Sequence, residues 1–471
     1  MTSEDAGGPV GTARDAVIYI VAVAFVGAVL WLMLGNFKQT MAGTIFIATV
    51  IGTLMFWRFR LAIAFVGISA LLATSTLDIT EMIQFMNIDV ICFLIGMMIL
   101  VDIAKESGLF IWILDKLLKA TKYDPRKVLI VLLAMSTLMA AMVDEVTSIL
   151  FIIAIIFEYC KYFDIDPLPY VISAVLATNV GSSATVLGNP IGILIALRGS
   201  LTFVDFLMWA TPVALMSLLL LIAILPLWYR KPLAEAKVKV LAKMNGATSA
   251  DVLETIGQDR MKDVKISGVI LFGTIFFIAL HAQLEPIFGL EKDTLLLVFS
   301  FLGAAAGLFW KRATARQIVE RGVDWWSLVF FMFLFAKAGA LKFTGLTDRL
   351  ASGIASVARS QVQIQSIVLW LACGASSVLD NVVLVAALIP VVQSLVAIGY
   401  KSTPLSFALL FGGVYGGNIT MIGSTANIVA LGMLEKKFNY HMKFFKWLWV
   451  GILGGVLPTL VAQVWLTAFF H

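Results

Sequence analysis

The amino-acid sequence predicts an all-α polytopic membrane protein built from two inverted repeats. Hydrophobic residues fill 61% of its 471 positions and charged residues 13%, about half the charged share of soluble domains. Two apolar segments, 167–197 and 404–434, are each interrupted by glycine, hydroxyl and amide residues. Aligned without gaps, the interruptions place Gly181 on Gly416. Paired interruptions of this kind indicate the binding site of a secondary transporter.

Long apolar runs predict the membrane-crossing helices of the first half, because a crossing needs about 20 apolar residues. The first fifteen residues are polar and acidic, and no small-residue cleavage site follows the first apolar run. We therefore expect a first crossing helix rather than a cleavable signal peptide. The predicted crossings are 16–34, 41–57, 61–74, 88–104, the broken segment 167–197, and 207–229.

Residues 128–163 form an apolar stretch that is too long for one crossing and carries Asp144 and Glu145 at its middle. Two carboxylates at the centre of a bilayer are costly unless they reach a wet cavity. We therefore expect a re-entrant hairpin whose tip, residues 144–147, faces such a cavity. Just before it, residues 105–127 have the spacing of an amphipathic helix that lies along the membrane surface.

The second half repeats this pattern after a basic connector, residues 230–265. A second hairpin, 362–398, carries Asp380 and Asn381 near its tip, and 344–360 is again amphipathic. The remaining predicted crossings are 266–280, 294–310, 325–343, the broken segment 404–434, and 447–470. We expect N-terminal scaffold helices in 1–87, a first repeat in 88–229, the connector in 230–265, scaffold helices in 266–322 and a second repeat in 323–471.

The distribution of lysine and arginine predicts the orientation. It fits the positive-inside rule if the N-terminus is cytoplasmic and both hairpins return to the side from which they enter. The first hairpin then enters from the cytoplasm and the second from outside, so the repeats are inverted. We expect a multi-pass protein of the cell (plasma or inner) membrane with its C-terminus outside.

The candidate site lies where the hairpin tips meet the interruptions. Half-helix N-termini favour anions, whereas unwound carbonyls and carboxylates favour cations. Three acids at two tips favour cations, and their mutual repulsion makes proton release compete with cation binding. The first half-site comprises Asp144, Glu145, Thr147, Asn179, Ser182, Ser183, Thr185 and Asn189, and the second comprises Asp380, Asn381, Asn418, Thr420, Ser424, Thr425 and Asn427.

A structural role for the three acids is the alternative. Each could cap a half-helix or pair with a basic group, and this is most plausible for Glu145, because its counterpart Asn381 is neutral. Lys337 and Asp102 occupy equivalent positions in the two copies. A lysine inside a crossing costs free energy unless it is paired or reaches water. We therefore expect Lys337 to be paired or to snorkel. The alternative is a functional role in coupling.

The remaining composition excludes several classes of function. The three cysteines and three histidines lack metal or disulfide spacing, and no phosphate loop, zinc motif or nucleophile elbow is present. We expect no enzyme activity, no nucleic-acid partner, no resident metal and no cofactor beyond a bound transported cation such as sodium. A channel is a rival that two inverted copies with deep acidic tips disfavour.

These motifs resemble those of the ion transporter superfamily. Residues 179–190 resemble the first signature of its branch of arsenite permeases, NhaD-type sodium–proton antiporters and the pigment P protein, which shares a citrate-transporter-like domain. Residues 417–427 resemble the second signature, and 142–147 and 378–382 are similar to the two tip motifs.

The resemblance implies an elevator-type transporter, usually a homodimer, in which 128–200 and 362–434 move against a fixed scaffold. Asn189 stands where the antiporters have aspartate and is more like arsenite and silicic-acid efflux relatives, while Glu145 adds an acid nearby. We expect sodium(cation)–proton antiport, with transport of an anion or metalloid (arsenite, silicic acid) or sodium-coupled dicarboxylate transport as the alternatives.

Overall fold

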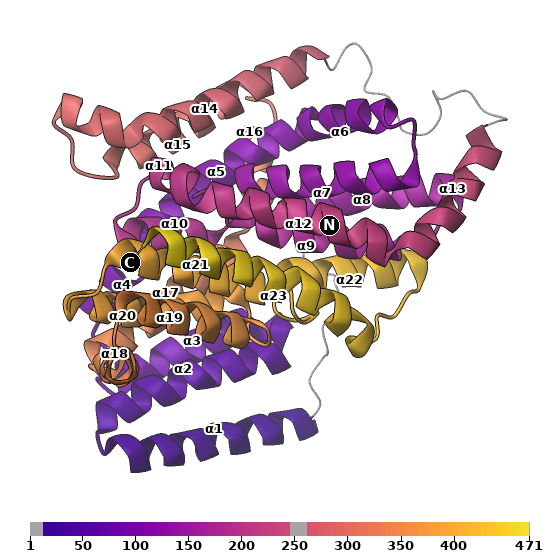
Figure 1. The fold of residues 1–471 in the computed structure, drawn as a ribbon. Helices are drawn as coiled ribbons and strands as arrows, with labels where there is room; N and C mark the ends of the chain where they lie inside the picture. The colour runs from indigo at the N-terminus through magenta and orange to yellow at the C-terminus, as the bar shows by residue number, and fades with distance from the viewer. Residues whose placement is uncertain (1–12, 245–260, 471) are drawn as a thin grey trace.

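The computed structural model describes residues 13–244 and 261–470, and every regular element in these ranges is helical (Figure 1). The first half contains α1 (Ala13–Leu34), α2 (Phe37–Met55), a short turn (Trp57–Phe59), α3 (Arg60–Ala73), α4 (Ile79–Phe85), α5 (Ile88–Glu106), α6 (Leu109–Ala120), α7 (Pro125–Met142), α8 (Glu145–Phe163), α9 (Leu168–Ser182), α10 (Pro190–Gly199), α11 (Phe203–Asp205), α12 (Thr211–Trp228) and α13 (Arg230–Met244).

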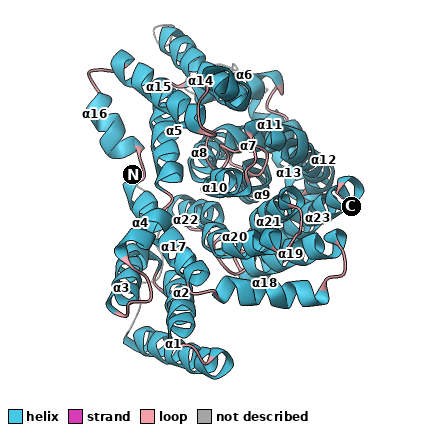
Figure 2. Cartoon of the chain, turned by 90° about the vertical axis from the view of Figure 1, so that its left-hand side faces the viewer, coloured by secondary structure: helices cyan, strands magenta, loops and turns pink. Residues whose placement is uncertain are grey.

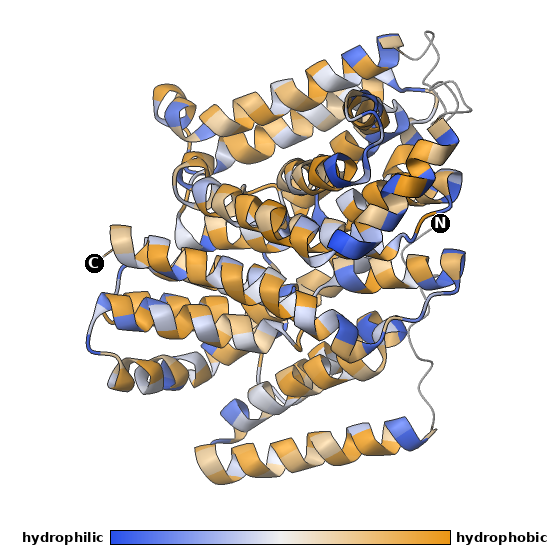
Figure 3. Ribbon diagram, turned by 45° about the vertical axis from the view of Figure 1, so that its right-hand side comes forward, coloured by the Kyte–Doolittle hydropathy of each residue, from blue (hydrophilic) through white to orange (hydrophobic). Residues whose placement is uncertain are grey.

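The second half follows with α14 (Met261–Phe288), α15 (Thr294–Trp310), α16 (Ala315–Gln317), α17 (Trp325–Phe343), α18 (Leu346–Val357), α19 (Gln361–Ser376), α20 (Asn381–Ala397), α21 (Ser402–Gly416), α22 (Thr425–Phe438) and α23 (Phe444–Phe469). Within the described residues, eight helices are long and apolar enough to cross a membrane, or nine if the bent pair α4–α5 counts as one crossing. Figure 3 shows hydrophilic residues gathered at helix ends and connections. The chain is therefore a multi-pass membrane protein.

The sequence analysis predicts no helix between the crossings 61–74 and 88–104, whereas the structure has α4 there, bent against α5. Asp78 caps α4 by accepting a hydrogen bond from the Glu81 amide, 2.8 Å away, and such a cap stabilises a first turn. Asn87 then adopts a left-handed backbone with φ of 51°, and the chain turns by 42° into α5. The polar residues here begin one helix and redirect the next.

Two helical hairpins, α7–α8 and α19–α20, carry an aspartate at the tip. Asp144 caps α8 by accepting hydrogen bonds from the Val146 and Thr147 amides at 2.9 and 2.8 Å. Asp380 caps α20 in the same way, from Val382 and Val383 at 3.0 and 3.4 Å. Because an N-terminal cap satisfies free amides, each aspartate fixes where the second helix of its hairpin begins.

The interruptions fall at residues 183–189, between α9 and α10, and at 417–424, between α21 and α22. Each is packed against a hairpin through one glycine. A Cβ added to Gly181 would lie 2.2 Å from the Thr137 carbonyl oxygen of α7, and one added to Gly416 would lie 2.3 Å from that of Cys373 in α19. These aligned glycines are required by close backbone packing.

The two hairpins open toward opposite ends of the molecule. At the open end of α7–α8, Asp164 pairs with Lys239 of the connector helix α13 at 2.9 Å, and this hydrogen bond and the lysine charge lower the pKa of Asp164. At the open end of α19–α20, the Ser402 hydroxyl donates to the Gly199 carbonyl, at the far end of α10. α1 begins and α23 ends at opposite ends as well (Figure 1).

The remaining helices flank this central arrangement. In Figure 2, α1–α5 and α14–α17 lie along one side, and α7–α10 with α19–α23 form the cluster on the other. The predicted amphipathic segments are α6 and α18, and α6 buries Leu109, Leu114 and Leu118. The predicted connector is helical over Arg230–Met244, while its residues 245–260 lie outside the described residues.

We predict that Gly181→Ala and Gly416→Ala each lower the free energy of unfolding by about 1–3 kcal/mol, because an extra methyl group overpacks a backbone contact. The measurement is the thermal unfolding of the purified protein in detergent. Gly374→Ala in α19 is the matched control, because nothing lies within 4 Å of its added Cβ. An equal loss in the control and in Gly181→Ala would contradict the packing role.

Candidate substrate-binding site

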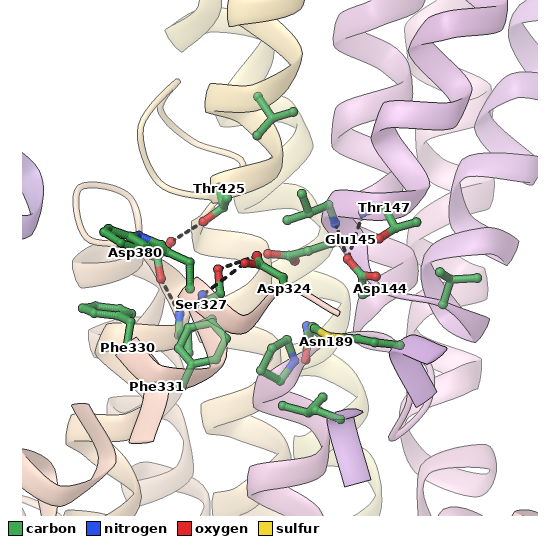
Figure 4. A pocket seen from close by; sticks show the side chains of 18 of the residues that line it. Asp144, Glu145, Thr147, Asn189, Asp324, Ser327, Phe330, Phe331, Asp380 and Thr425 are labelled. Atoms are coloured by element: carbon green, nitrogen blue, oxygen red, sulfur yellow. Dashed lines mark hydrogen bonds between the residues drawn. The ribbon is translucent and has the colours of Figure 1, made fainter. Parts of the chain in front are cut away.

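A cavity of about 320 Å³ lies between the two hairpin tips, the first turns of α3 and α17, and the middle of α5 (Figure 4). Backbone breaks and helix N-termini meet there, so the site offers both helix dipoles and fixed charges to a ligand. The charged residues that line it are Arg58, Arg60, Asp144, Glu145, Asp324 and Asp380. Acids outnumber bases in this lining by four to two.

Glu145, the first residue of α8, lies at the centre of the arrangement with 3% of its surface exposed. Its carboxylate accepts from the Asn381 amide at 3.3 and 3.4 Å, from Ser182 at 3.3 Å and from Ser424 at 3.5 Å. These donors are neutral and their hydrogen bonds are long. In the described part of the chain, no basic side chain pairs with Glu145 within 4.0 Å.

Three asparagines form a separate polar cluster, which we call the asparagine clasp: Asn179, Asn418 and Asn427. The Asn179 amide nitrogen donates to Asn418 Oδ1 at 2.7 Å and to Asn427 Oδ1 at 2.9 Å. Asn418 Nδ2 donates to two backbone carbonyls, and so does Asn427 Nδ2. Asn179 Oδ1 accepts from Ser424. All three asparagines are fully buried, so the clasp joins the two interruptions.

The other hydroxyl residues of the motifs contact protein groups. Thr185 donates to the Ala141 carbonyl and Thr420 to the Ser377 carbonyl, so that each interruption is tied to the tip of its own hairpin. Ser183 bonds the Tyr415 hydroxyl at 3.0 Å. Asn189 donates to Ser182 at 3.0 Å and caps α10.

The structure therefore divides the predicted site residues into two groups. Asp144, Glu145, Thr147, Asn189, Asp380 and Thr425 line the cavity. The remaining ones are packed behind this lining: Asn179, Ser182, Ser183, Thr185, Asn381, Asn418, Thr420, Ser424 and Asn427. The capping role that the sequence left open for the acids is present at Asp144 and Asp380, whereas Glu145 caps nothing.

Lys337 and Asp102 lie away from the cavity. Lys337 is fully buried, so it does not snorkel, and its ammonium donates to the Thr49 hydroxyl of α2 at 2.9 Å. Asp102 lies 3.6 Å from Lys105, one turn along α5. Their sequence equivalence therefore does not bring them together at the hairpin tips.

Four charged or hydroxyl-bearing residues of the cavity lining were not predicted as site residues: Arg58, Arg60, Asp324 and Ser327. The arginines entered the sequence analysis only through the orientation argument, and none of the quoted motifs includes Asp324 or Ser327. Arg60 donates to the Ser327 hydroxyl at 2.7 Å, and Ser327 donates to Asp324 at 2.6 Å. The available signal was the position of Arg58, Arg60 and Asp324 directly next to predicted crossings.

Comparison with known proteins identifies the family. A sequence model of the citrate transporter family, CitMHS, matches residues 44–412, with a second match at 295–468. The chain belongs to the citrate transporter family. It is a secondary transporter and not an enzyme, and the match leaves the substrate and the coupling ion of this member undefined.

Curated relatives agree with this assignment, and a solved structure has a similar fold. The uncharacterized transporter Rv2684 of Mycobacterium tuberculosis is 31% identical over 352 residues, which cover 74% of this chain and 78% of that protein. The human P protein is 26% identical over 83% of this chain and 54% of its own length. The structure of Neisseria gonorrhoeae MtrF, from a class of antimetabolite efflux pumps, covers 94% of this chain at 15% identity with a TM-score of 0.54. The last similarity concerns the fold alone.

We predict that Asn179→Ala destabilises the protein, because it leaves two buried amide oxygens without a donor, at about 1–3 kcal/mol each. Asn179→Asp should be at least as harmful, since a carboxylate cannot donate to Asn418 and Asn427. Thermal unfolding in detergent measures the effect. Asn439→Gly is the control, because Asn439 is exposed and left-handed, and glycine adopts that backbone freely. An unchanged Asn179→Ala protein would contradict the clasp.

Proposed function

We propose that this transporter exchanges a small cation, sodium first among the candidates, for protons by an elevator movement. The observation that carries the proposal is Glu145, a buried carboxylate whose recorded partners are neutral donors. A buried charge without a counter-charge is strongly disfavoured. A bound proton or cation supplies that counter-charge, and the two compete for the same oxygens.

The surroundings of Glu145 support a cation. Asn381 Oδ1 is buried and has no hydrogen-bond partner among the described residues, while its amide nitrogen already faces Glu145. Asp144, the preceding residue, and Asp380 line the same cavity as Glu145 and add negative charge to it. Oxygen ligands of this kind suit hard cations. Among the described residues, no three His, Cys, Asp or Glu side chains form a metal cluster, and weak ligation suits an ion that must be released.

The elevator movement is supported by a difference between the two ends of α17, at Ser327 and at Lys342. The cavity lies beside Ser327, near the start of α17. About 22 Å along the helix, Lys342 donates to Gln393 of α20 at 2.8 Å. At the same end of α17 as Lys342, Arg198 of α10 pairs with Asp89 of α5 at 2.7 Å. The end near Ser327 holds the cavity of about 320 Å³, whereas two side-chain pairs bridge the other end beside a smaller cavity of about 210 Å³. This asymmetry is what we expect of one state of an alternating-access carrier.

We assign the parts of the carrier accordingly. Residues 128–200 and 362–434 form the proposed moving domain, and α1–α5 with α14–α17 belong to the proposed scaffold. The proposed inverted repeats are 88–229 and 323–471, supported by hairpins that open toward opposite ends. We also propose a cytoplasmic N-terminus and an external C-terminus, supported by the distribution of basic residues and by the ends of α1 and α23. The proposal of a homodimer rests on the resemblance to the ion transporter superfamily alone.

A carboxylate anion is the second candidate substrate. Arg58 and Arg60 line the cavity, and its volume of about 320 Å³ exceeds the need of a bare ion. The family description also names citrate. Both arginines come from the α2–α3 turn, so an anion would bind across the cavity from Glu145. Succinate and citrate are therefore included in the transport test.

We predict that Glu145→Gln abolishes cation-driven proton movement, because the amide cannot hold a cation or release a proton in the working range. The loss of a charged contact reduces binding about tenfold or more. Proton flux is followed with a pH-sensitive dye in proteoliposomes to which sodium, lithium, potassium, succinate or citrate is added in turn. Glu158→Gln, an exposed position on the same helix, is the control. Proton flux driven only by succinate or citrate would favour the anion.

We also predict that a covalent link between α5 and α10, at the end bridged by Asp89 and Arg198, blocks transport. Cysteines replace Asp89 and Arg198 in a protein whose native Cys92, Cys160 and Cys373 are alanine, and a bifunctional maleimide joins them. Since α5 is fixed and α10 moves in the proposed mechanism, the link should stop flux. Each single-cysteine variant treated with the same reagent is the control. Full flux through a completely linked protein would contradict the elevator movement.

A further inference from the structure

Arg60 is a scaffold residue that the sequence motifs do not include. It begins α3, is 7% exposed, and donates from Nη2 to the Ser327 hydroxyl at 2.7 Å. Its guanidinium lies over the Trp57 ring at 4.4 Å and near the Phe330 ring at 5.4 Å, and stacking on aromatic faces suits arginine. These contacts all come from the proposed scaffold, so they hold Arg60 at a fixed place on the cavity wall.

Asp380 faces this wall from the proposed moving domain. One carboxylate oxygen caps α20, and the other accepts from the Thr425 hydroxyl at 2.8 Å. Figure 4 shows Asp380, Ser327 and Phe330 at the same corner of the cavity. Arg60 lines the same cavity as Asp380, and its partner Ser327 lies beside Asp380 in Figure 4. Asp380 thus has a cationic neighbour across the domain boundary, unlike Glu145.

We propose that Arg60 is a resident counter-ion for Asp380, fixed on the scaffold, that holds the empty carrier in this state until a cation or proton replaces it. This inference rests on the proposed elevator function. When the moving domain slides, Asp380 leaves and Arg60 stays. An empty carrier would then bury an uncompensated carboxylate, which is strongly disfavoured. When a cation or proton neutralises Asp380, the moving domain can slide without that penalty. Arg60 therefore makes the movement depend on whether Asp380 is occupied.

The competition has a second consequence. Because Arg60 and the transported cation neutralise the same carboxylate, removal of the guanidinium charge should strengthen cation binding while it weakens coupling. Arg60→Lys keeps the charge and should preserve the behaviour in part, since lysine lacks the planar stacking surface. A purely structural role for Arg60 does not predict tighter cation binding.

The test measures the distance between the proposed moving domain and the proposed scaffold directly. Spin labels are attached to Ile79→Cys in α4 and Ile398→Cys after α20, both exposed, in the protein whose three native cysteines are alanine. Distance distributions are recorded in choline chloride, and then with increasing sodium or lithium. The set comprises the parent protein, Arg60→Gln, Arg60→Lys, Asp380→Asn and the double variant Arg60→Gln/Asp380→Asn, with exposed Arg316→Gln as the control.

In choline, the parent and Arg316→Gln should show one dominant distance. Arg60→Gln should populate a second distance about tenfold more than the parent, and should need about tenfold less sodium for half of the shift. The double variant should show less than the sum of the single effects, because the partners act as a pair. Asp380→Asn also tests the pair should Arg60→Gln fail to fold.

Two outcomes separate the inference from the proposed function. If sodium or lithium shifts the parent but Arg60→Gln behaves as the parent does, the resident counter-ion is overturned and the elevator movement stands. If the parent keeps one distance with sodium, with lithium and on acidification, the elevator movement is itself contradicted and the inference falls with it.

Discussion

The buried carboxylate of Glu145 connects the two hairpins and the two interrupted helix pairs, α9–α10 and α21–α22. Glu145 begins the second helix of one hairpin and accepts from Asn381 at the tip of the other. It also accepts from Ser182, the last residue of α9, and from Ser424 in the second interruption. Its charge lacks a basic partner among the described residues. The cavity, the backbone breaks and the dipoles of the half-helices converge where this charge needs compensation.

The two copies of the repeat are similar in backbone and different in charge. Asp144 and Asp380 perform the same capping task, and Gly181 and Gly416 allow the same close approach. The next tip residue is acidic in the first copy and an amide in the second. The second tip instead lies beside Arg60. We therefore interpret Glu145 as the carboxylate that holds the exchangeable ion, and Asp380 in the same cavity as the carboxylate at which that ion competes with Arg60.

The asparagine clasp explains how the breaks can be irregular and yet buried. Interrupted helices expose backbone groups that lipid cannot satisfy. Asn427 donates to two carbonyls of the second interruption, those of Gly417 and Thr420. Asn418 donates to carbonyls of α9 and α23, and Asn179 of α9 donates to both other asparagines. Because the clasp is saturated with hydrogen bonds, it acts as a rigid support, and ion binding is left to the oxygens nearer Glu145.

Much of this arrangement could be predicted from the sequence. Interrupted apolar segments and mid-span acids specify the breaks and the tips, because lipid tolerates such residues only at wet or protein-lined places. Residue patterns do not specify which polar groups satisfy one another, so Asn179, Asn418 and Asn427 could equally have been ligands. Arg60 and Asp324 reach the tips only through the packing of α3 and α17, which hydrophobic periodicity does not encode. The α4–α5 bend depends on one local cap, Asp78.

The central claim is that Glu145 holds the transported cation in competition with a proton. Binding of radioactive sodium to the purified protein tests it without requiring transport or movement. The account predicts saturable binding that weakens as the pH falls, that is lost in Glu145→Gln and that persists in Glu158→Gln. Sodium binding of equal strength in Glu145→Gln, with the same dependence on pH, would contradict it.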